Sequence, residues 1–483
     1  MSIITGNDYI KRIDSLNNEI WIDGERIIGN LSEHPAFRGI LKSKGKLYDL
    51  QHDITAGPVL TRRSPENNEP FNFAYEQPTT REALEKRREA TQLWAKKSAG
   101  TMGRSPDYVN TAIMTLGTSS AFFKGRFSEN IQNIFANAVE NDLSFAHTFI
   151  NPQVNRSFRN NEFKTNNKKD NVIGAKVINE NEKGIVVHGA RLLATQGGVT
   201  DEILVLPVSG NTTDPASAYA FAIPSNTSGL RFICRESYAN SDENTFNQPF
   251  SSQYDEVDSI VVFDEVLVPW ERVFVYEDLN TSAGIFSLTN LNTMLIYQAL
   301  CRQVVKTEFL LGLGESIAKT ISIKEYQHVQ EKISEIIMSV EIMKSLLYKA
   351  EREAQQNLFG TMVPHDKPLL VAASYFQKTY PRLVEILHLL GASGFITLPT
   401  EQDFNSAIGK DLNQYLQSKN DSAKKRVELF RLAWDLTMSP FGSRQTQFER
   451  FFFGDSVRLS SSLYQLYDKA TYVKYVQSFL DEH

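Results

Sequence analysis

Apolar and polar residues follow different periods in different parts of the chain. Up to about residue 150, apolar residues recur at helical spacing after an irregular start, which predicts helices over 79–98, from Ser105 onward, and over 128–140. From 151 to 277 the pattern changes to short runs of β-branched and aromatic residues, such as GIVVHGARLLAT, separated by clusters of Gly, Pro, Asn and Ser. Such runs are typical of a compact β-sandwich or barrel.

Long helical periods return after residue 278, over 287–320, 325–357, 367–390, 422–438 and 443–467. Helices of this length, joined by turns such as the one at 391–394, predict an antiparallel bundle, and such bundles often associate with further copies. We therefore expect an α+β fold with an N-terminal mainly helical domain (1–150), a middle β domain (151–277) and a C-terminal helical bundle (278–483).

The composition is that of an ordinary globular protein, and it narrows the function classes. A net charge of −6 leaves no basic footprint for nucleic acid. The two cysteines, Cys234 and Cys301, are far apart and exclude a disulfide framework or a four-thiolate cluster within one chain. The first residues carry charge where a signal peptide is apolar, and no stretch approaches the ~18 apolar residues of a membrane span. We expect a cytoplasmic protein with neither nucleic-acid nor membrane partners.

The segment GRSPDY holds the most informative local pattern. Ser105 suits an N-cap, Pro106 the first helical position and Asp107 the acidic first turn, so a helix should begin here, and its mostly apolar continuation predicts a helix covered on most sides. Arg104 would lie at the positive end of the helix dipole, where a cation is disfavoured, so it requires an anionic partner. Two interpretations are open. Arg104 and Tyr108 converge on an oxygen of a ligand, or a nearby carboxylate satisfies the arginine while the tyrosine only packs.

The order of helical, β and helical regions, together with FDEVLVPWERV (263–273), resembles the acyl-CoA dehydrogenase-like flavoprotein fold. A series of motifs runs in order through nearly the whole chain: WIDGERI (21–27), SEHPAFRG (32–39), GRSPDY (103–108), INPQVNRS (150–157), FAIP (221–224), GLRFICRE (229–236) and ERFFFGD (449–455). These motifs resemble one branch of that fold, the 4-hydroxyphenylacetate 3-monooxygenase oxygenase components.

The resemblance implies a two-component system. A separate reductase would supply reduced FAD, transiently or by diffusion of the flavin, and this chain would use it with O2 to convert a 4-substituted phenol to a catechol. The sequence has no G-x-G-x-x-G after a strand, so it offers no nicotinamide site of its own. The family also suggests a homotetramer.

The resemblance places Arg104, Tyr108 and His147 at the phenolic oxygen of the substrate, with Ser105, Pro106 and Asp107 in the same substrate-binding segment. Hydroxylation needs an electron-rich ring, so the site should favour phenolate character. A histidine that titrates near neutrality would suit the taking or sharing of the phenol proton. A lone histidine is more often structural, and none of the eight falls in an HxxxH or HExxH metal pattern.

The FAD contacts that the resemblance implies fall in three places along the chain: His147, Thr148, Phe149, Gln153, Val154, Asn155 and Arg156; Thr195; and Gly454, Asp455, Ser456 and Val457. The threonine would lie near the reactive edge of the flavin ring. Taken alone, the first stretch ends in a turn, Thr195 is a strand-end residue facing solvent, and the last group is a turn between helices.

One departure from the family pattern concerns the substrate. Where relatives acting on 4-hydroxyphenylacetate carry hydroxyl groups for the side-chain carboxylate, this chain has Val208 and then Ser209. Ser209, Thr212 or Thr213 could still donate to a carboxylate. The glycine, serine and asparagine content of this loop suggests a lid that excludes water. This departure does not change the expected substrate class, but it leaves the identity of the particular phenol undetermined.

Other functions of this fold agree less well with the sequence. A 4-hydroxybutyryl-CoA dehydratase needs an iron–sulfur cluster that two cysteines cannot hold, and nothing in the bundle signals the carboxylate base of an acyl-CoA dehydrogenase. The main alternative is a flavin carrier or regulatory protein of the same fold without hydroxylase activity. The presence of Arg104, Tyr108 and His147 together argues against a carrier, because a carrier needs no phenol contacts.

Overall fold

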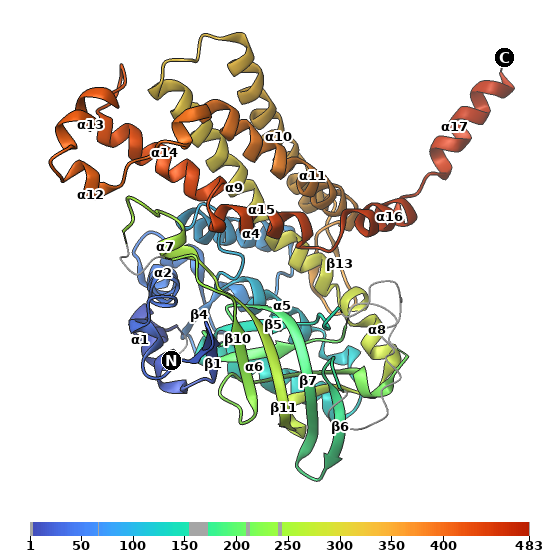
Figure 1. The fold of residues 1–483 in the computed structure, drawn as a ribbon. Coiled ribbons are helices and arrows are strands. Elements are labelled where there is room, and N and C mark those ends of the chain that lie inside the picture. Colours follow the sequence, from blue (N-terminus) through green and yellow to red (C-terminus); the bar gives the residue numbers. More distant parts are fainter. Residues whose placement is uncertain (1–2, 66, 154–171, 209–212, 240–243, 483) are drawn as a thin grey trace. The chain divides into compact units, whose positions relative to one another are not determined.

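The computed structural model describes residues 3–65, 67–153, 172–208, 213–239 and 244–482 (Figure 1). They form two compact units. The first contains Met1–Lys306 and Gln356–Val363, and the second contains Thr307–Gln355 and Pro364–His483. The order of helices, strands and helices along the chain confirms the predicted α+β class, whereas the domain borders at 150 and 277 stay a prediction.

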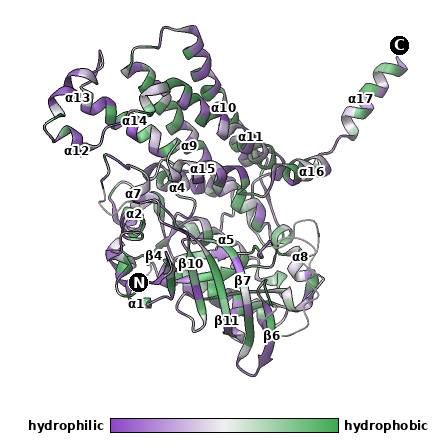
Figure 2. Ribbon diagram, viewed as in Figure 1, coloured by the Kyte–Doolittle hydropathy of each residue, from purple (hydrophilic) through white to green (hydrophobic). Residues whose placement is uncertain are grey.

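A six-stranded sheet forms the larger β layer of the first unit. Its order is β2–β1–β10–β11–β7–β6, with bounds Glu25–Arg26, Ile20–Ile22, Leu230–Cys234, Asp258–Pro269, Gly184–Thr195 and Lys176–Asn181. The long strands β7 and β11 pair in antiparallel fashion and carry runs of hydrophobic residues interrupted by hydrophilic ones (Figure 2). On β7, for example, Ile185 and Val187 are buried, and His188 is half-buried. The run predicted at 184–195 is this strand.

A second sheet of four strands lies in the order β12–β9–β8–β5, with bounds Val273–Tyr276, Tyr219–Pro224, Glu202–Val205 and Phe145–Thr148. One apolar core joins the two sheets and includes Val187 of β7, Val205 of β8, Phe221 of β9 and Phe263 of β11. Among the described residues both sheets have unpaired edges. Of the two predicted β architectures, the sandwich is therefore confirmed and the closed barrel is wrong.

The principal helices of the first unit are α1 (Gly6–Leu16), α2 (Arg38–Asp49), α4 (Arg81–Lys97), α5 (Tyr108–Thr118), α6 (Arg126–Asn141) and α8 (Leu279–Leu288). The helices predicted over 79–98 and 128–140 are α4 and α6. Residues 108–117 of α5 are all buried, as its apolar sequence predicted. The short strands β1, β2 and β5, and the hairpin of β3 (Thr61–Arg63) with β4 (Pro70–Asn72), were not predicted in this part of the chain.

The second unit is helical. Its main helices are α10 (Gln327–Arg352), α11 (Asp366–Gly391), α14 (Ala423–Thr437), α15 (Pro440–Phe451), α16 (Ser456–Leu466) and α17 (Ala470–Asp481), together with the C-terminal part of α9 (Leu291–Thr320). Two predicted helices are in fact broken. The span 287–320 is divided between α8 and α9, and 443–467 is interrupted at Gly454, whose φ of 95° suits glycine and not a helix. No described helix is both long and apolar enough to cross a bilayer.

Candidate active site

Helix α5 begins at Tyr108, and the residues just before it form turns. The Ser105 hydroxyl does not cap the helix but donates to Asp107 Oδ1 at 2.5 Å. The same carboxylate accepts from Gln298 Nε2 at 2.9 Å. The predicted start, with Ser105 as N-cap and Pro106 as first helical residue, is therefore wrong, because local side-chain bonds to Asp107 compete with capping.

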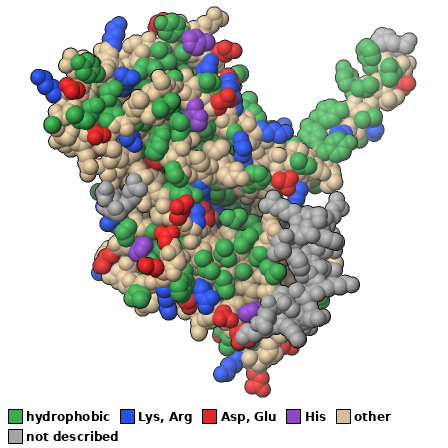
Figure 3. Space-filling model, in the orientation of Figure 1, with side chains coloured by type: hydrophobic (Ala, Val, Ile, Leu, Met, Phe, Trp, Pro, Cys, Tyr) green, Lys and Arg blue, Asp and Glu red, His purple; other side chains and the backbone are tan. Residues whose placement is uncertain are grey.

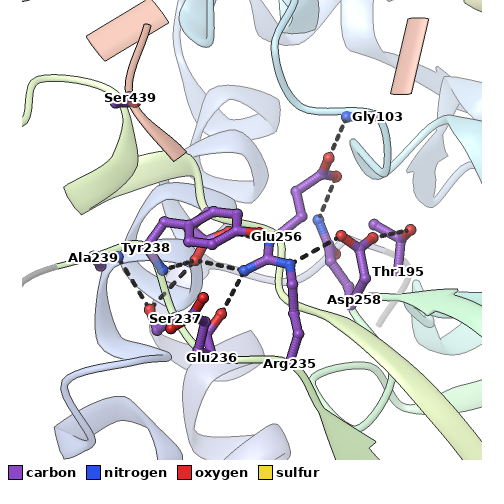
Figure 4. Close-up of polar contacts among 12 residues, drawn as sticks. Gly103, Thr195, Arg235, Glu236, Ser237, Tyr238, Ala239, Glu256, Asp258 and Ser439 are labelled. Atoms are coloured by element: carbon purple, nitrogen blue, oxygen red, sulfur yellow. Dashed lines mark hydrogen bonds and ion pairs between the residues drawn. The ribbon is translucent and has the colours of Figure 1, made fainter. Parts of the chain in front are cut away.

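Arg104 lies in this turn segment with 6% of its surface exposed. Its guanidinium carbon is 4.5 Å from the centroid of the Tyr108 ring, a distance at which a cation is attracted to a ring face. The backbone N–H groups of Gly103 and Arg104 donate to the two oxygens of the Glu256 carboxylate, at 2.9 and 2.7 Å; the first bond is drawn in Figure 4. The segment is thus held by its backbone on one side and by a stacked side chain on the other.

His147 lies in strand β5, which pairs in parallel with β8 so that His147 is opposite Leu204. The imidazole is 3% exposed. Its ring centroid is 5.7 Å from that of Tyr108 and 5.3 Å from that of Phe149. Among the described residues, neither ring nitrogen has a hydrogen-bond partner. The structure therefore brings together Arg104, Tyr108 and His147, a cluster that we call the clamp. The imidazole of the clamp has unused hydrogen-bonding capacity.

Burial, followed by the positive charge of Arg104, lowers the pKa of His147 from 6.5 to about 3. The expectation that this histidine titrates near neutrality is therefore wrong for the ligand-free protein, and the ring is neutral at neutral pH. Burial also raises the pKa of Tyr108 above its ordinary value of 10.0, although Arg104 and Arg302 oppose the rise. Tyr108 consequently stays protonated and can donate a hydrogen bond.

The clamp has the chemistry of a site for an oxygen that alternates between hydroxyl and anion. A buried polar atom without a partner costs about 1–3 kcal/mol, and a ligand that supplies the partner recovers this. A neutral imidazole offers one donor and one acceptor. The permanent charge of Arg104 favours an oxygen that carries negative charge. A phenolic oxygen meets all three requirements.

The expected flavin contacts next to His147 divide into described and undescribed residues. The Thr148 hydroxyl donates to the carbonyl oxygen of Leu192 at 2.8 Å. The half-buried ring of Phe149 stacks edge-on against Phe286, with centroids 5.9 Å apart. Gln153 is exposed. The remaining members of this group, Val154, Asn155 and Arg156, lie outside the described residues.

Thr195 ends strand β7 and is 3% exposed, so a solvent-facing threonine is excluded. Its hydroxyl donates to Asp258 Oδ1 at 2.7 Å, and Asp258 in turn accepts from Arg235 Nε at 3.3 Å, as Figure 4 shows. Because its one proton is directed at Asp258, the Thr195 oxygen can only accept a further hydrogen bond. That lone pair suits an N–H group, such as those on the edge of a reduced flavin ring.

The third expected flavin group, 454–457, lies in the second unit. A Cβ at Gly454 would meet nothing within 4 Å, and its carbonyl oxygen accepts from Gln377 Nε2 at 2.8 Å. Asp455 caps α16 by accepting from the backbone N–H groups of Val457 and Arg458, at 3.1 and 2.9 Å. The first residue of the helix, Ser456, is exposed. The turn interpretation and an open, glycine-lined approach for a ligand are both compatible with this geometry.

The substrate loop begins just after β8. Val208 is half-buried and Thr213 is exposed. Ser209 and Thr212 lie outside the described residues, as does most of the expected lid. In the clamp segment, Pro106 is buried, as are its neighbours Ser105 and Asp107. The structure therefore describes the expected phenol-binding residues, and of the loop candidates it describes Val208 and Thr213.

Sequence analysis missed the group that anchors the clamp. Glu256 lies in the acidic run DEVD before β11, and such a run gives no indication that one carboxylate is 1% exposed. The only signal is that acidic residues immediately precede a buried strand. The partner of Glu256, the Arg104 backbone, is 152 positions away, a separation over which spacing carries no information.

Comparison with known proteins gives matches over nearly the full length. Residues 5–275 match the family model described as 4-hydroxyphenylacetate 3-hydroxylase N terminal, and residues 282–481 match its C-terminal counterpart. A probable 4-hydroxyphenylacetate 3-monooxygenase of Bacillus subtilis (strain 168) is 49% identical over 483 residues, covering 99% of both chains. The 4-hydroxyphenylacetate 3-monooxygenase oxygenase component of Thermus thermophilus is 40% identical over 479 residues, covering 99% of this chain and 97% of that one.

A solved structure supports the same relationship. The crystal structure of an oxygenase component of 4-hydroxyphenylacetate 3-monooxygenase, complexed with FAD and 4-hydroxyphenylacetate, superposes with a TM-score of 0.94 at 40% identity. The alignment covers 99% of this chain and 98% of that chain. The fold agreement therefore covers nearly all of the sequence.

Proposed function

This chain belongs to the 4-hydroxyphenylacetate 3-hydroxylase family, and we propose that it is the oxygenase component of a two-component flavin-dependent monooxygenase. It uses reduced FAD and O2 to hydroxylate a 4-substituted phenol, such as 4-hydroxyphenylacetate, beside the phenolic hydroxyl group. The product is a catechol. The observation that carries this proposal is the clamp, in which a neutral imidazole without partners among the described residues lies beside a buried arginine and a protonated tyrosine.

Each clamp residue has a separate role at the phenolic oxygen. Arg104 keeps its charge at any working pH and favours the phenolate. Tyr108 donates a hydrogen bond without adding charge. His147 accepts the phenol proton in a hydrogen bond, and as negative charge develops on the phenolic oxygen the pKa of the imidazole rises, so that the proton can move onto it. The ring becomes most electron-rich when the proton leaves the oxygen.

The residues near the clamp fit FAD. When bound, reduced FAD supplies the activated oxygen atom that is transferred to the ring. Phe149 offers an aromatic face, Thr195 offers only lone pairs, and Thr148 is fixed by its bond to Leu192. For Gly454 and its neighbours, which belong to the second unit, we propose a further FAD contact, on the support of the open space around Gly454.

The partners follow from the same proposal. An oxygenase component receives reduced FAD from a separate reductase, by transient contact or by flavin diffusion, and we place both proteins in the cytoplasm. We further propose a homotetramer. Its support is α17, where six apolar side chains are each more than half exposed in a single chain: Tyr472, Val473, Tyr475, Val476, Phe479 and Leu480. They form the green row along this helix in Figure 3.

The test is direct hydroxylation without the reductase. Chemically reduced FAD, oxygenated buffer and 4-hydroxyphenylacetate or tyramine are mixed with the protein, and the catechol is quantified by chromatography. We expect catechol formation in proportion to reduced FAD. Oxidation of the flavin that yields only hydrogen peroxide across a panel of phenols would refute the hydroxylase and leave the flavin carrier as the function.

A further inference from the structure

A continuous series of buried polar contacts connects helix α2 to the clamp. Lys44 of α2 donates from Nζ to Gln196 Oε1 at 2.8 Å. The amide Nε2 of Gln196 donates to Glu256 Oε1 at 3.1 Å. Glu256 in turn accepts from the backbone N–H groups of Gly103 and Arg104, at 2.9 and 2.7 Å. Three chain segments that are remote in sequence thus meet behind the residue that contacts the phenol.

The carboxylate is well suited to hold this backbone. Two N–H groups from successive residues point to its two oxygens, and hydrogen bonds to an ionised acceptor are about twice as strong as neutral ones. An amide in the same place has one oxygen and one NH2, so it can accept from one N–H but must oppose the other. The geometry therefore selects glutamate over glutamine at position 256.

The middle residue of the series is held under strain. The backbone of Gln196 has a φ of 59°, in the left-handed region that residues other than glycine seldom adopt. Its side chain is 0% exposed, and its backbone N–H lies 3.1 Å from the Glu256 carbonyl oxygen and 3.2 Å from that of Val257. A strained conformation of this kind persists where surrounding contacts determine it, and it is concentrated near functional sites.

The two ends of the series are a basic and an acidic group, both in the interior. Lys44 and Glu256 are each 1% exposed, and the amide of Gln196 bridges them. Buried charges are tolerated where other groups compensate them. A lysine that only supported the fold could be satisfied by any nearby oxygen. Here it fixes the orientation of the amide, and through it the Nε2 donor aimed at Glu256.

We propose that Glu256 is a positioning residue for the phenol-binding arginine, and that Lys44 acts on it through Gln196. Glu256 sets the backbone of Gly103 and Arg104, and with it the position of the guanidinium over Tyr108. Lys44 and Gln196 keep the carboxylate in the one orientation that serves both N–H groups. This inference rests on the proposed hydroxylation, because its effect is on the alignment of the phenol.

The experiment compares Glu256→Gln with wild type in the full-length protein. The KM for 4-hydroxyphenylacetate and the fraction of reduced FAD converted to catechol are measured with chemically reduced FAD. Hydrogen–deuterium exchange is followed in peptides that cover 99–110. Misplacement by about 1 Å can cost about 100-fold, so we expect kcat/KM for catechol formation to fall roughly 10- to 100-fold, with faster exchange at 103 and 104. The rate of reduced-FAD oxidation without phenol should stay within about twofold.

Asp142→Asn is the matched control. Asp142 is also a buried carboxylate of the first unit that accepts hydrogen bonds from side-chain amides, but these belong to Gln51 and Asn72 and not to the clamp. It should lower the melting temperature and leave the KM for the phenol unchanged. Loss of stability alone therefore cannot mimic the expected result. If Glu256→Gln does not fold, Gln196→Met, which keeps the carboxylate, is tested in the same way.

A double-mutant cycle tests the part played by Lys44. Lys44→Met alone should raise the KM by about threefold, and adding it to Glu256→Gln should have no further effect, because residues acting through one contact are not additive. Fully additive effects would overturn the assignment of Lys44. A KM and catechol yield within twofold of wild type in Glu256→Gln would overturn the inference as a whole. Wild-type protein that forms no catechol would instead refute the proposed function.

Discussion

Asp142 and His147 are a few residues apart in the first unit, and both are buried, but they differ in their hydrogen bonding. Asp142 is 0% exposed, and its carboxylate accepts from Gln51 Nε2 at 2.8 Å and from Asn72 Nδ2 at 2.9 Å. His147 is 3% exposed, and its ring nitrogens have no partner among the described residues. The first side chain completes its hydrogen bonds within the fold, and the second does not.

The difference agrees with the proposed roles, in which Asp142 stabilises the protein and His147 serves a ligand. Most buried polar groups in native proteins are satisfied, so an exception needs an explanation. At Asp142, burial raises the pKa while the amide donors oppose the rise. At His147, burial and Arg104 both disfavour the charged form. Substitutions at the two places should therefore separate activity from stability.

The largest expected effect is that of His147→Ala. Removing a general acid–base group typically costs about 100- to 10,000-fold in rate, and we expect catechol formation to fall by this amount. The free energy of unfolding should fall by the lost ring packing against Tyr108 and Phe149, but not by the loss of a hydrogen bond to a described residue. Catechol yield is measured with chemically reduced FAD, and reduced-FAD binding under nitrogen serves as the control. An unchanged yield would remove His147 from the mechanism.

Arg104→Ala should cost somewhat less. Loss of one group that stabilises developing negative charge typically lowers the rate by about 100-fold. Because Arg104 is the second cause of the low pKa of His147, the substitution should also raise that pKa from about 3, while burial keeps it below 6.5. Carbon-13-labelled histidine and NMR titration measure the shift. A His147 pKa that does not move would show that the two side chains are not electrostatically coupled.

Asp142→Asn tests the other side of the comparison. An asparagine retains one acceptor and places an NH2 against the donors of Gln51 or Asn72, so a buried group loses its partner at a cost of about 1–3 kcal/mol. The free energy of unfolding, from urea titration, should fall by this amount. Catechol yield per folded molecule should stay at the wild-type value. A selective loss of activity would show that Asp142 also supports the site.

The last effect concerns pH and Lys44, whose pKa burial lowers from 10.5 to about 7. Between these values the unfolded chain holds a proton that the folded protein has released, so stability should increase as pH rises from 7 to 10, by at most about 1.4 kcal/mol per pH unit. Below pH 7 the contribution is constant. Lys44→Met should lack this slope, and urea unfolding of both proteins at pH 7, 8 and 9 measures the difference. Parallel curves would show that Lys44 keeps its ordinary pKa when buried.

Local patterns were sufficient for the regular elements. The run GIVVHGARLLAT is rich in apolar and β-branched residues, as strands are, and it is β7 from its first residue to its last. Thr80 accepts a hydrogen bond from the Ala83 backbone and starts α4 within the predicted span. Both elements depend on neighbours within a few positions, which is the range that periodicity and capping can describe.

For the candidate site, the sequence could predict which residues take part but not how they are arranged. The family resemblance named Arg104, Tyr108 and His147, and the structure brings them together, yet the start of α5 was misplaced because Asp107 bonds to Ser105 and to the distant Gln298. The low pKa of His147 depends on complete burial, which sequence spacing does not reveal. Glu256 was missed for the same reason, since the backbone N–H groups of Gly103 and Arg104 that it accepts from are 153 and 152 positions away.

The parallel pairing of β5 with β8 has a consequence for how such an enzyme diversifies. His147 is opposite Leu204, and a few residues later the same strand β8 leads into the loop that starts with Val208. The hydrogen bonds between β5 and β8 fix the position of His147 in the proposed site. The loop lies beyond the last pair of these strands, Thr148 and Val205. Insertions or substitutions after Val208 can therefore accumulate without shifting the register of His147. Evolution can exchange the phenol that is accepted while the chemistry performed on it is inherited unchanged.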